Sequence, residues 1–296
     1  MDVVIIFNGL GNQMSQYAFY LSKYNLSPST RFVFSKKSNK IHNGYELEKV
    51  FGIKYRDSMM NKLLFSIYKI LDYKKFPVIS KPFIRLLGFF GLEIINENDD
   101  YQFKPAYLLP SKGIKFYAGG WPSEKYFTHI KQKVQNTFQF DTENIGKENR
   151  EVLNQLKKTA SVSVHIRRGD FLAPINYEKF GVVCTKNYYV TAIEMMKERV
   201  KDPHFFFFTN DFNWVSAHFI GDNYTIININ KSGDSWKDMF LISNCTHHIN
   251  SNGTFSWWSS WLTDHNNAIV IVPKNFIAGK YFEDVYPENW IKLSDY

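Results

Sequence analysis

Residues 3–14 read VVIIFNGLGNQM, and this stretch decides the fold class. Its first five residues are wholly apolar and mostly β-branched, which is typical of a buried strand in a parallel sheet. A loop with two glycines follows, and apolar side chains then recur at helical spacing between Met14 and Leu21. Strand, glycine loop and helix in this order predict the opening of a Rossmann-like unit.

The second half of the chain shows the same alternation of apolar strands and amphipathic helices. Its strands are expected at 160–165, 204–208, 224–227, 246–249 and 268–272, and its helices at 188–200, 212–219, 235–242 and 255–262. A strand at 31–34 and a short helix at 45–51 are expected in the first half. The helix at 188–200 should turn Val190, Ile193, Met196 and Val200 inward. The alternation predicts an α/β protein with doubly wound parallel sheets.

A polar stretch at 141–150 separates the two halves and is expected to hold a linker. The length of 296 residues fits two domains of roughly 150 residues each. We therefore expect domains at 1–145 and 146–296. Parallel sheets bind ligands beyond the carboxyl ends of their strands, so the loops at those ends are the candidate binding sites.

Charge and cysteine content narrow the class of protein. The 36 Lys and Arg against 28 Asp and Glu give a net charge of +8, which favours phosphates, nucleic acid or an anionic membrane as partners. Two cysteines, Cys184 and Cys245, exclude a disulfide framework and a Cys-rich metal site and fit a reducing compartment. Neither a targeting segment nor a transmembrane stretch is expected, which indicates a cytoplasmic location.

Residues 60–95 interleave apolar side chains with basic ones, among them Lys69, Lys74, Lys75 and Arg85. The preferred interpretation is a basic helical insertion packed on the first domain. The alternative is peripheral contact with the inner face of a membrane, because basic amphipathic segments bind anionic lipid surfaces.

The first candidate loop is residues 8–14. Gly9 and Gly11 permit a tight turn and close approach of a ligand to the backbone. Free N–H groups at the start of the following helix favour an anion or a polar sugar, and the carboxamides of Asn12 and Gln13 suit sugar hydroxyls. The loop fits neither the dinucleotide fingerprint nor a Walker loop, so a plain turn is the alternative.

The second candidate loop is HIRRGD, residues 165–170. Strand alternation predicts that His165 and Arg167 point one way and Arg168 the other. An arginine fork binds phosphate oxygens through two parallel hydrogen bonds, so Arg167 is expected to meet a phosphate. For Arg168 we expect a structural ion pair with Asp170. A satisfied core histidine is the alternative for His165.

The third candidate loop is SNGTFSWW, residues 251–258. Hydroxyls, a glycine and a helix start coincide there, which offers N–H donors to a phosphate. A helix N-cap by Thr254 or Ser251 is the alternative, and both can hold at once. The tryptophans at 257, 258 and 261 are expected to pack as core behind the loop.

Metal binding is not expected. His247 and His248 are adjacent on a strand and therefore point apart. The chain also lacks the Asp-x-Asp motif with which many metal-dependent sugar transferases hold a divalent cation. Asp211 follows the strand at 204–208 and can accept from a purine edge or cap the next helix.

Three blocks, GLGNQM at 9–14, HIRRGDF at 165–171 and SNGTFSWW at 251–258, resemble the α-1,2-fucosyltransferases of glycosyltransferase family 11. YELEKVF at 45–51 and GWPSEKYF at 120–127 are similar to further blocks of that family. The blocks follow in the family's order over nearly the whole chain, whereas the basic segment at 60–95 matches no block that we can place. Gly253 stands where many members have serine.

The resemblance implies a GT-B-like architecture, in which two Rossmann-like domains face a cleft and the N-terminal domain lies on the acceptor side. It implies inverting transfer of L-fucose from GDP-β-L-fucose to the 2-hydroxyl of a galactose, with no metal or other cofactor required. The acceptor would be a galactose-terminated oligosaccharide or a lipid-linked glycan.

The resemblance also implies roles for individual residues. Arg167 would contact the β-phosphate, His165 the nucleotide and Asp211 the guanine. The implied diphosphate site is the backbone around Thr254, Phe255 and Ser256, and the implied fucose and acceptor site is the loop with Gly11, Asn12 and Gln13.

Inversion ideally uses a base that takes the proton of the acceptor. Glu124, Asp170 and Glu46 are the candidates, although Asp170 is better suited to orienting an arginine. Glu124 follows Trp121, which could serve as a platform for a sugar. A transfer in which GDP departs ahead of attack needs no strong base.

Two other classes of function compete with glycan fucosylation. Protein O-fucosyltransferases of the secretory pathway generally carry more disulfides than two cysteines allow. The charge of +8 suggests a non-catalytic nucleotide or nucleic-acid binder, but no nucleic acid is expected as a partner. Tight GDP binding without affinity for oligonucleotides would dismiss that class.

Overall fold

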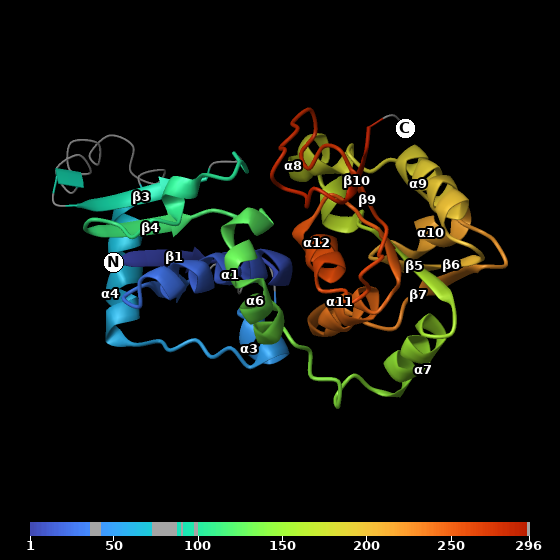
Figure 1. Cartoon of the computed structure of the whole chain (residues 1–296), viewed down its shortest axis with the longest axis horizontal. Coiled ribbons are helices and arrows are strands. Elements are labelled where there is room, and N and C mark those ends of the chain that lie inside the picture. The colour runs from blue at the N-terminus through green and yellow to red at the C-terminus, as the bar shows by residue number, and fades with distance from the viewer. Residues whose placement is uncertain (36–42, 73–87, 90, 98–99, 295–296) are drawn as a thin grey trace. The chain divides into compact units, whose positions relative to one another are not determined.

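The computed structural model describes residues 1–35, 43–72, 88–89, 91–97 and 100–294. The chain divides into two compact units, Met1–Gln139 and Phe140–Tyr296 (Figure 1). This division falls a few residues before the boundary expected at 145/146. Only the first part of the polar stretch at 141–150 is a connection, because helix α7 (Lys147–Leu156) begins within it.

Unit 1 is built on a four-stranded parallel sheet with the order β2-β1-β4-β3. The strands are β1 (Asp2–Ile6), β2 (Arg31–Phe34), β3 (Leu92–Asn96) and β4 (Ile114–Ala118). Helix α1 (Leu10–Leu26) connects β1 to the parallel neighbour β2, as residues 3–14 predicted. The sequence did not predict β3 and β4, because each includes a charged residue. These charges pair across the two strands, with Lys115 Nζ 2.8 Å from Glu93 Oε2.

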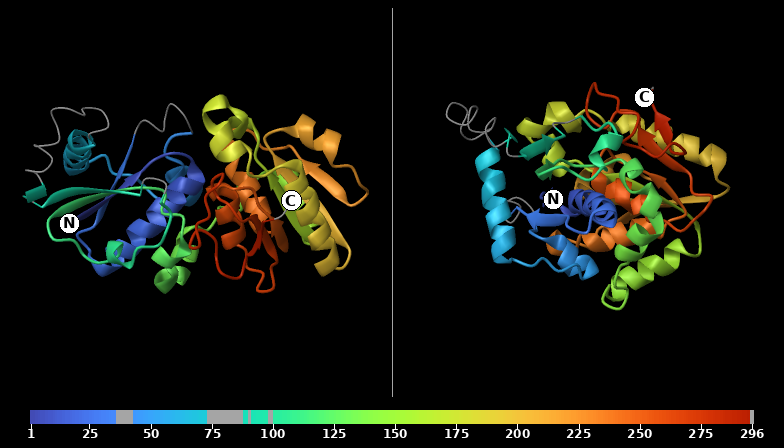
Figure 2. Two further views of the ribbon diagram at one scale, coloured as in Figure 1. Left: turned by 90° about the horizontal axis from the view of Figure 1, so that it is seen from above. Right: turned by 60° about the vertical axis from the view of Figure 1, so that its left-hand side comes forward.

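Helices cover both faces of this sheet (Figure 2). Val3 and Ile5 of β1 pack in one cluster with Leu64 and Leu71 of α4 (Met59–Leu71). The alternate residues of β1 are also buried and face the other side, where α1 lies. The remaining elements of unit 1 are α3 (Glu46–Phe51), η2 (Pro105–Tyr107), η3 (Glu124–Tyr126), η4 (Thr128–Ile130) and α6 (Lys131–Thr137).

Helix α4 confirms a packed helix at the start of the basic segment. The expectation of helix through residue 95 is wrong, because residues 92–95 pair with β4 as part of β3. Residues 73–87 of the segment lie outside the described part of the chain, together with the expected roles of Lys74, Lys75 and Arg85.

Unit 2 contains a six-stranded parallel sheet with the order β10-β9-β8-β5-β6-β7. Its strands are β5 (Ala160–Ile166), β6 (Pro203–Thr209), β7 (Tyr224–Ile227), β8 (His247–Ile249), β9 (Val270–Pro273) and β10 (Ile291–Leu293). Its main helices are α9 (Lys186–Arg199), α10 (Phe212–His218), α11 (Trp236–Ser243) and α12 (Thr254–Trp261). The shorter elements are η5 (Gly169–Leu172), α8 (Pro174–Asn176), η6 (Tyr177–Gly181) and η7 (Ser232–Asp234).

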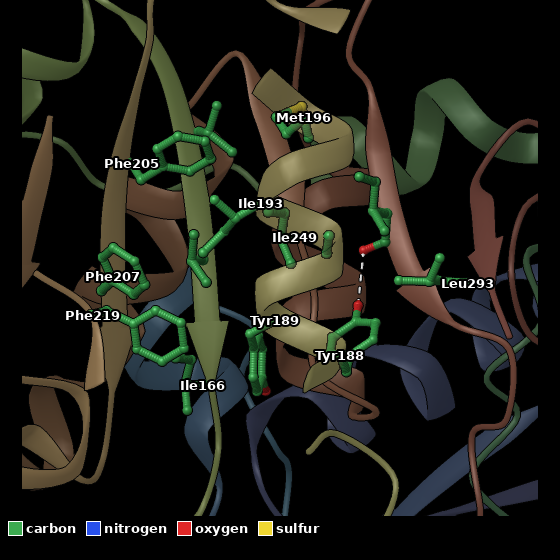
Figure 3. Close-up of a cluster of buried hydrophobic side chains, with 14 of the residues drawn as sticks. Ile166, Tyr188, Tyr189, Ile193, Met196, Phe205, Phe207, Phe219, Ile249 and Leu293 are labelled. Carbon is green, nitrogen blue, oxygen red and sulfur yellow. Dashed lines mark hydrogen bonds between the residues drawn. The ribbon is translucent and has the colours of Figure 1, made fainter. Parts of the chain in front are cut away.

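The core of unit 2 lies between the sheet and α9. Tyr189, Ile193 and Met196 of α9 pack against β5 and β6 (Figure 3). The expectation that Val190 points inward is wrong, since Val190 is 42% exposed. Tyr189 takes the inward position because residues 189, 193 and 196 share one face of the helix. The parallel sheets and alternating helices in both units confirm the predicted α/β class.

Candidate active site

A cavity of about 390 Å³ opens at the carboxyl ends of β5, β6 and β7 in unit 2. Its polar lining comes from several elements: His165 and Arg167 at the end of β5, Thr209 and Asn210 at the end of β6, Asn228, Asn230, Lys231 and Ser232 after β7, and Ser235 and Asp238 around the start of α11. Phe212 and Phe255 supply apolar wall. The cavity thus lies at the carboxyl ends of parallel strands, where the sequence places its candidate site.

Strand alternation places His165 and Arg167 together. Ile166 packs in the core beside α9, so its two neighbours face the side of the sheet where α12 lies. His165 Nδ1 is 2.9 Å from Ser251 Oγ, and its ring stacks on Phe255 with 5.3 Å between centroids. Burial lowers the pKa of His165 to about 3, and the charge of Arg167 acts in the same direction. His165 is therefore a neutral hydrogen-bonding group in this cavity.

Arg167 lines the cavity with its guanidinium held by Asp170. Nε and Nη2 of Arg167 donate to the two carboxylate oxygens of Asp170 at 3.0 and 2.8 Å. The guanidinium also lies 5.1 Å from the centre of the Phe171 ring. Since the Arg167 side chain retains 31% exposure, the pair orients the arginine without closing it off from a ligand. With both oxygens engaged by a cation, Asp170 is better placed to position Arg167 than to accept a proton.

The expected ion pair between Arg168 and Asp170 is wrong. Arg168 points to the other side of the loop, where its Nε donates to Asp211 Oδ2 at 3.0 Å. Its guanidinium stacks 4.0 Å from the ring centre of Trp214. Asp211 Oδ1 accepts from the Trp214 N–H at 3.2 Å and so caps α10. Asp211 thus takes the capping role that the sequence left open and does not line the cavity, and a guanine contact through it remains only a prediction.

The start of α12 offers donors to an anion. Gly253 is its N-cap, no side chain caps the helix, and the first turn holds no acidic residue. The alternative of an N-cap by Thr254 or Ser251 is therefore wrong. Within the described residues, the backbone N–H groups of Thr254 and Phe255 donate to no protein acceptor. Ser256 is buried and its hydroxyl donates to Ser251 O at 3.1 Å, so only its backbone could meet a ligand.

At the start of α1, an acidic side chain already accepts a hydrogen bond from a backbone N–H group. Glu46 Oε2 accepts from the Leu10 N–H at 3.0 Å. Gln13 is fully buried, and its Nε2 donates to Asn8 O and Gly44 O at 2.7 Å each. Its Oε1 accepts from the Glu46 N–H at 3.0 Å. The sugar contact expected of the Gln13 side chain and the base role expected of Glu46 are therefore wrong, because both side chains are used inside the fold.

The other residues of the first loop have different roles. Asn8 has the left-handed backbone, with φ of 65°, whereas Gly9 does not need its glycine freedom for this turn. Gly11 is buried within α1. Asn12 remains half-exposed, so its expected sugar contact stays a prediction. A carboxylate already occupies the start of α1, so the helix start suited to a diphosphate is that of α12.

The block GWPSEKYF at 120–127 donates backbone hydrogen bonds to a buried glutamate, Glu97, that the sequence analysis did not predict as important. Glu97 Oε2 accepts from the N–H groups of Gly120 and Trp121 at 2.6 and 3.0 Å. Burial raises the pKa of Glu97 to about 7, against these bonds. Trp121 is fully buried and stacks on Phe19, so a sugar platform at Trp121 is wrong. Glu124 starts η3 half-exposed, and its role as a base stays a prediction.

Asp238 is the cavity residue that the sequence did not predict. It lies in the first turn of α11, and its Oδ1 accepts from Asn230 Nδ2 at 2.7 Å. Asn149 holds Asn230 in turn, with bonds of 2.8 and 3.0 Å between the two carboxamides. Burial raises the pKa of Asp238 to about 7. On α11, Asp238 looks like an ordinary first-turn acid, and only its place in the cavity marks it.

The adjacent histidines of β8 point apart, as expected. His248 Nδ1 lies 2.9 Å from Ser163 Oγ, and His247 Nδ1 accepts from the Ile269 N–H at 3.0 Å. The described residues contain no group of three or more His, Cys, Asp or Glu able to hold a metal ion. The tryptophans of α12 pack as core, since Trp257, Trp258 and Trp261 are all buried.

Comparison with known sequences supports the resemblance of the motifs. The sequence model of glycosyl transferase family 11 matches residues 97–294. An α-1,2-colitosyltransferase of Escherichia coli is 29% identical over 302 residues, covering 99% of each chain. The human galactoside α-(1,2)-fucosyltransferase 1 is 29% identical over 154 residues, which cover 48% of this chain and 42% of the human protein.

Solved structures agree in fold. The fucosyltransferase NodZ from Bradyrhizobium superposes with a TM-score of 0.51 at 12% identity, covering 88% of this chain and 91% of NodZ. A mutant of Arabidopsis thaliana FUT1 in complex with GDP gives 0.50 at 12% identity, covering 97% of this chain and 74% of that one. The fold is thus the GT-B type, with two Rossmann-like units. The chain belongs to glycosyltransferase family 11.

Proposed function

We propose that this chain transfers L-fucose from GDP-β-L-fucose to the 2-hydroxyl of a terminal β-galactoside, with inversion and without a metal ion. One observation carries the proposal. Arg167 and the start of α12, whose first N–H groups have no protein acceptor among the described residues, lie at the same cavity at one edge of the sheet. The similarity to an α-1,2-colitosyltransferase and to α-1,2-fucosyltransferases supports the linkage.

The chemistry of transfer needs these donors. When the bond between fucose and phosphate breaks, positive charge develops on the sugar and negative charge on the departing GDP. Groups that meet charge as it develops lower the barrier, and preorganised groups do so without reorganisation. Asp170 holds the Arg167 guanidinium in one orientation through two hydrogen bonds. Arg167 and the first N–H groups of α12 can therefore neutralise the diphosphate where other enzymes use a divalent cation.

His165 suits the nucleotide as a neutral donor or acceptor. Its low pKa keeps the ring uncharged at neutral pH, and its contact with Ser251 fixes the ring orientation. Its role is then to position the nucleotide beside Arg167, and the ring itself adds no positive charge at the leaving group.

Asp238 is our candidate for the guanine contact in place of Asp211. Guanine presents two adjacent donors, N1–H and the exocyclic amine, and a carboxylate can accept from both. Asp238 lines the cavity and is oriented by Asn230, whereas both oxygens of Asp211 are engaged elsewhere.

Asp238→Asn is expected to weaken GDP binding by roughly 10- to 100-fold, because hydrogen bonds to charged groups contribute about 1.5–3 kcal/mol. Because the pKa of Asp238 is raised to about 7, the affinity of the wild type for GDP should depend on pH near neutrality. Only the ionised carboxylate accepts from guanine, so wild-type affinity should fall about tenfold per pH unit below pH 7. The Asn variant should lose this dependence. Isothermal titration with GDP and inosine diphosphate between pH 5.5 and 8 measures both effects.

Asp211→Asn is the matched control. It should leave the preference for GDP over inosine diphosphate unchanged, since Asp211 caps α10 and holds Arg168. If the preference disappears in Asp211→Asn and persists in Asp238→Asn, the assignment made here is reversed.

Metal independence and linkage are tested in one assay. The protein is incubated with GDP-fucose, EDTA and a panel of β-galactosides, and the products are identified by linkage analysis. We expect an α-1,2-linked product at a rate that EDTA leaves unchanged. Loss of activity in EDTA that Mg²⁺ or Mn²⁺ restores would exclude the metal-free reaction, and another linkage would exclude the acceptor hydroxyl proposed here.

A second candidate donor carries colitose, the 3-deoxy counterpart of fucose. The observation in its favour is the similarity to the Escherichia coli α-1,2-colitosyltransferase over 99% of both chains. Competition between the GDP-linked forms of the two sugars for one acceptor decides between the donors. A kcat/KM ratio that favours colitose would replace fucose in the proposal without changing the roles of Arg167 and α12.

A further inference from the structure

Helix α4 of unit 1 exposes an apolar face in addition to the one that packs on the sheet. Leu64 and Leu71 are buried in the unit 1 core, whereas Met59, Leu63 and Ile70 are 89%, 55% and 54% exposed. Steps of three and four residues place positions 59, 63, 66 and 70 in one row along the helix. We call Met59, Leu63 and Ile70 the α4 stripe. A row of large exposed apolar side chains is typical of an interaction surface.

Positive charge accompanies the α4 stripe. Lys62 and Lys69 are seven residues apart, so they lie along the same side of the helix, and both are exposed. The acid beside Lys62 is Asp57, at 3.8 Å, and both of these side chains are open to solvent. In the sequence, residues 54–90 carry eight Lys and Arg against two Asp, so this segment holds +6 of the net +8 of the chain.

We propose that the α4 stripe and its two lysines are a docking surface for an anionic lipid bilayer. The stripe would enter the boundary between headgroups and acyl chains, while Lys62 and Lys69 meet lipid phosphates. No helix among the described residues has the length and apolar content to cross a membrane. With 13 residues α4 is about 20 Å long, shorter than the hydrocarbon core of roughly 30 Å, so it would lie in the plane of the surface.

Charge decides between a bilayer and a second copy of this chain. A symmetric dimer through α4 would place the same patch of both copies face to face. Lys62 and Lys69 of one copy would then approach the same lysines of the other, and like charges across an interface oppose association. An anionic bilayer has the complementary charge and also accepts the apolar side chains.

Vesicle sedimentation tests the proposal on the full chain. Wild-type protein should sediment with vesicles of phosphatidylcholine and phosphatidylglycerol, should not sediment with phosphatidylcholine alone, and should be released by salt. Lys62→Gln with Lys69→Gln should weaken binding roughly 20- to 30-fold, at about 1 kcal/mol per basic residue. Met59→Ser, Leu63→Ser and Ile70→Ser together should reduce binding to background, because the stripe supplies the buried apolar area.

Two matched variants carry the same changes elsewhere. Lys112→Gln with Lys133→Gln removes two exposed lysines of unit 1 outside α4. Leu26→Ser, Leu109→Ser and Ile220→Ser remove three exposed apolar side chains, at 48%, 64% and 84% exposure. Both variants should bind the mixed vesicles as the wild type does, and circular dichroism confirms that every variant is folded.

Three results would overturn the proposal. The first is no binding of wild type to either kind of vesicle. The second is equal weakening in the α4 variants and in their matched controls, which would mean diffuse charge attraction. The third is a wild-type dimer in sedimentation velocity that the triple serine variant of α4 dissociates, which would make a second copy the occupant. None of these measurements uses the donor sugar, so the proposed transfer is tested separately.

Discussion

Arg167→Lys is expected to keep the fold and to lower kcat by about 10²–10³-fold, the loss that follows when one donor to a developing negative charge is removed. An ammonium keeps the charge but cannot bond Asp170 through two parallel N–H groups while also facing a phosphate. Arg167 makes both bonds to Asp170 and lines the cavity. Steady-state transfer from GDP-fucose measures the effect, and the KM for the acceptor should change little.

The neighbouring arginine provides the control for this prediction. Arg168→Lys changes the same kind of side chain one position along, but Arg168 pairs with Asp211 and stacks on Trp214 outside the cavity lining. Its kcat should stay close to wild type. The kcat of Asp170→Asn should fall between those of the two arginine variants, because it leaves the guanidinium in place without the carboxylate that orients it. Near-normal turnover by folded Arg167→Lys protein would refute the role of Arg167.

Lys23→Met is expected to lower the free energy of unfolding of unit 1 by about 3–5 kcal/mol, because it leaves a buried carboxylate without its counter-ion. Lys23 is 1% exposed and Asp2 is 2% exposed, and Lys23 Nζ lies 3.0 Å from Asp2 Oδ2. The ammonium also lies 4.3 Å from the ring centre of Tyr117. Burial lowers the pKa of Lys23, and the bond to Asp2 opposes this shift.

Hydrogen exchange in increasing urea, read by mass spectrometry, measures this loss, because peptides of residues 1–139 and 140–296 report on their own units. Peptides of unit 2 should be unaffected. The variant with both Asp2→Leu and Lys23→Met should recover most of the loss, since a buried ion pair can be replaced by apolar residues of similar volume at little cost. If the double variant is less stable than Lys23→Met alone, an unpaired Asp2 is not the cause of the loss.

The fold followed from sequence because apolar periodicity reports burial directly. The run at residues 3–7 and the alternating segments of the second half predicted β1, β5, β6, β7, β8 and β9 within a few residues of their observed bounds. Strands β3 and β4 were missed because Glu93 and Lys115 interrupt their apolar pattern. Each charge is acceptable in its strand only because the other lies beside it, and no local pattern shows such a partner.

The positions of some residues of the candidate site were also predicted correctly from the sequence, and those of others were not. Arg167 was predicted to face a ligand because strand alternation separates it from Arg168, and the cavity lining agrees. Gln13 and Glu46 look like free polar side chains in sequence, but each satisfies backbone groups across the loop. A carboxylate accepts from an N–H group at the start of α1, whereas the first turn of α12 holds no acid, so we propose α12 as the helix that receives a diphosphate.

The sequence by itself determined the α/β class, the strand ends at which the cavity opens, and the arginine that lines it, because these depend on periods of two and 3.6 residues along one chain. The tertiary structure decided which charges pair, namely Arg167 with Asp170 and Arg168 with Asp211. It also decided that Asp238 lines the cavity. Hydrogen bonds and ion pairs act over about 3 Å between residues that can be dozens of positions apart. Only the folded chain brings those partners within reach.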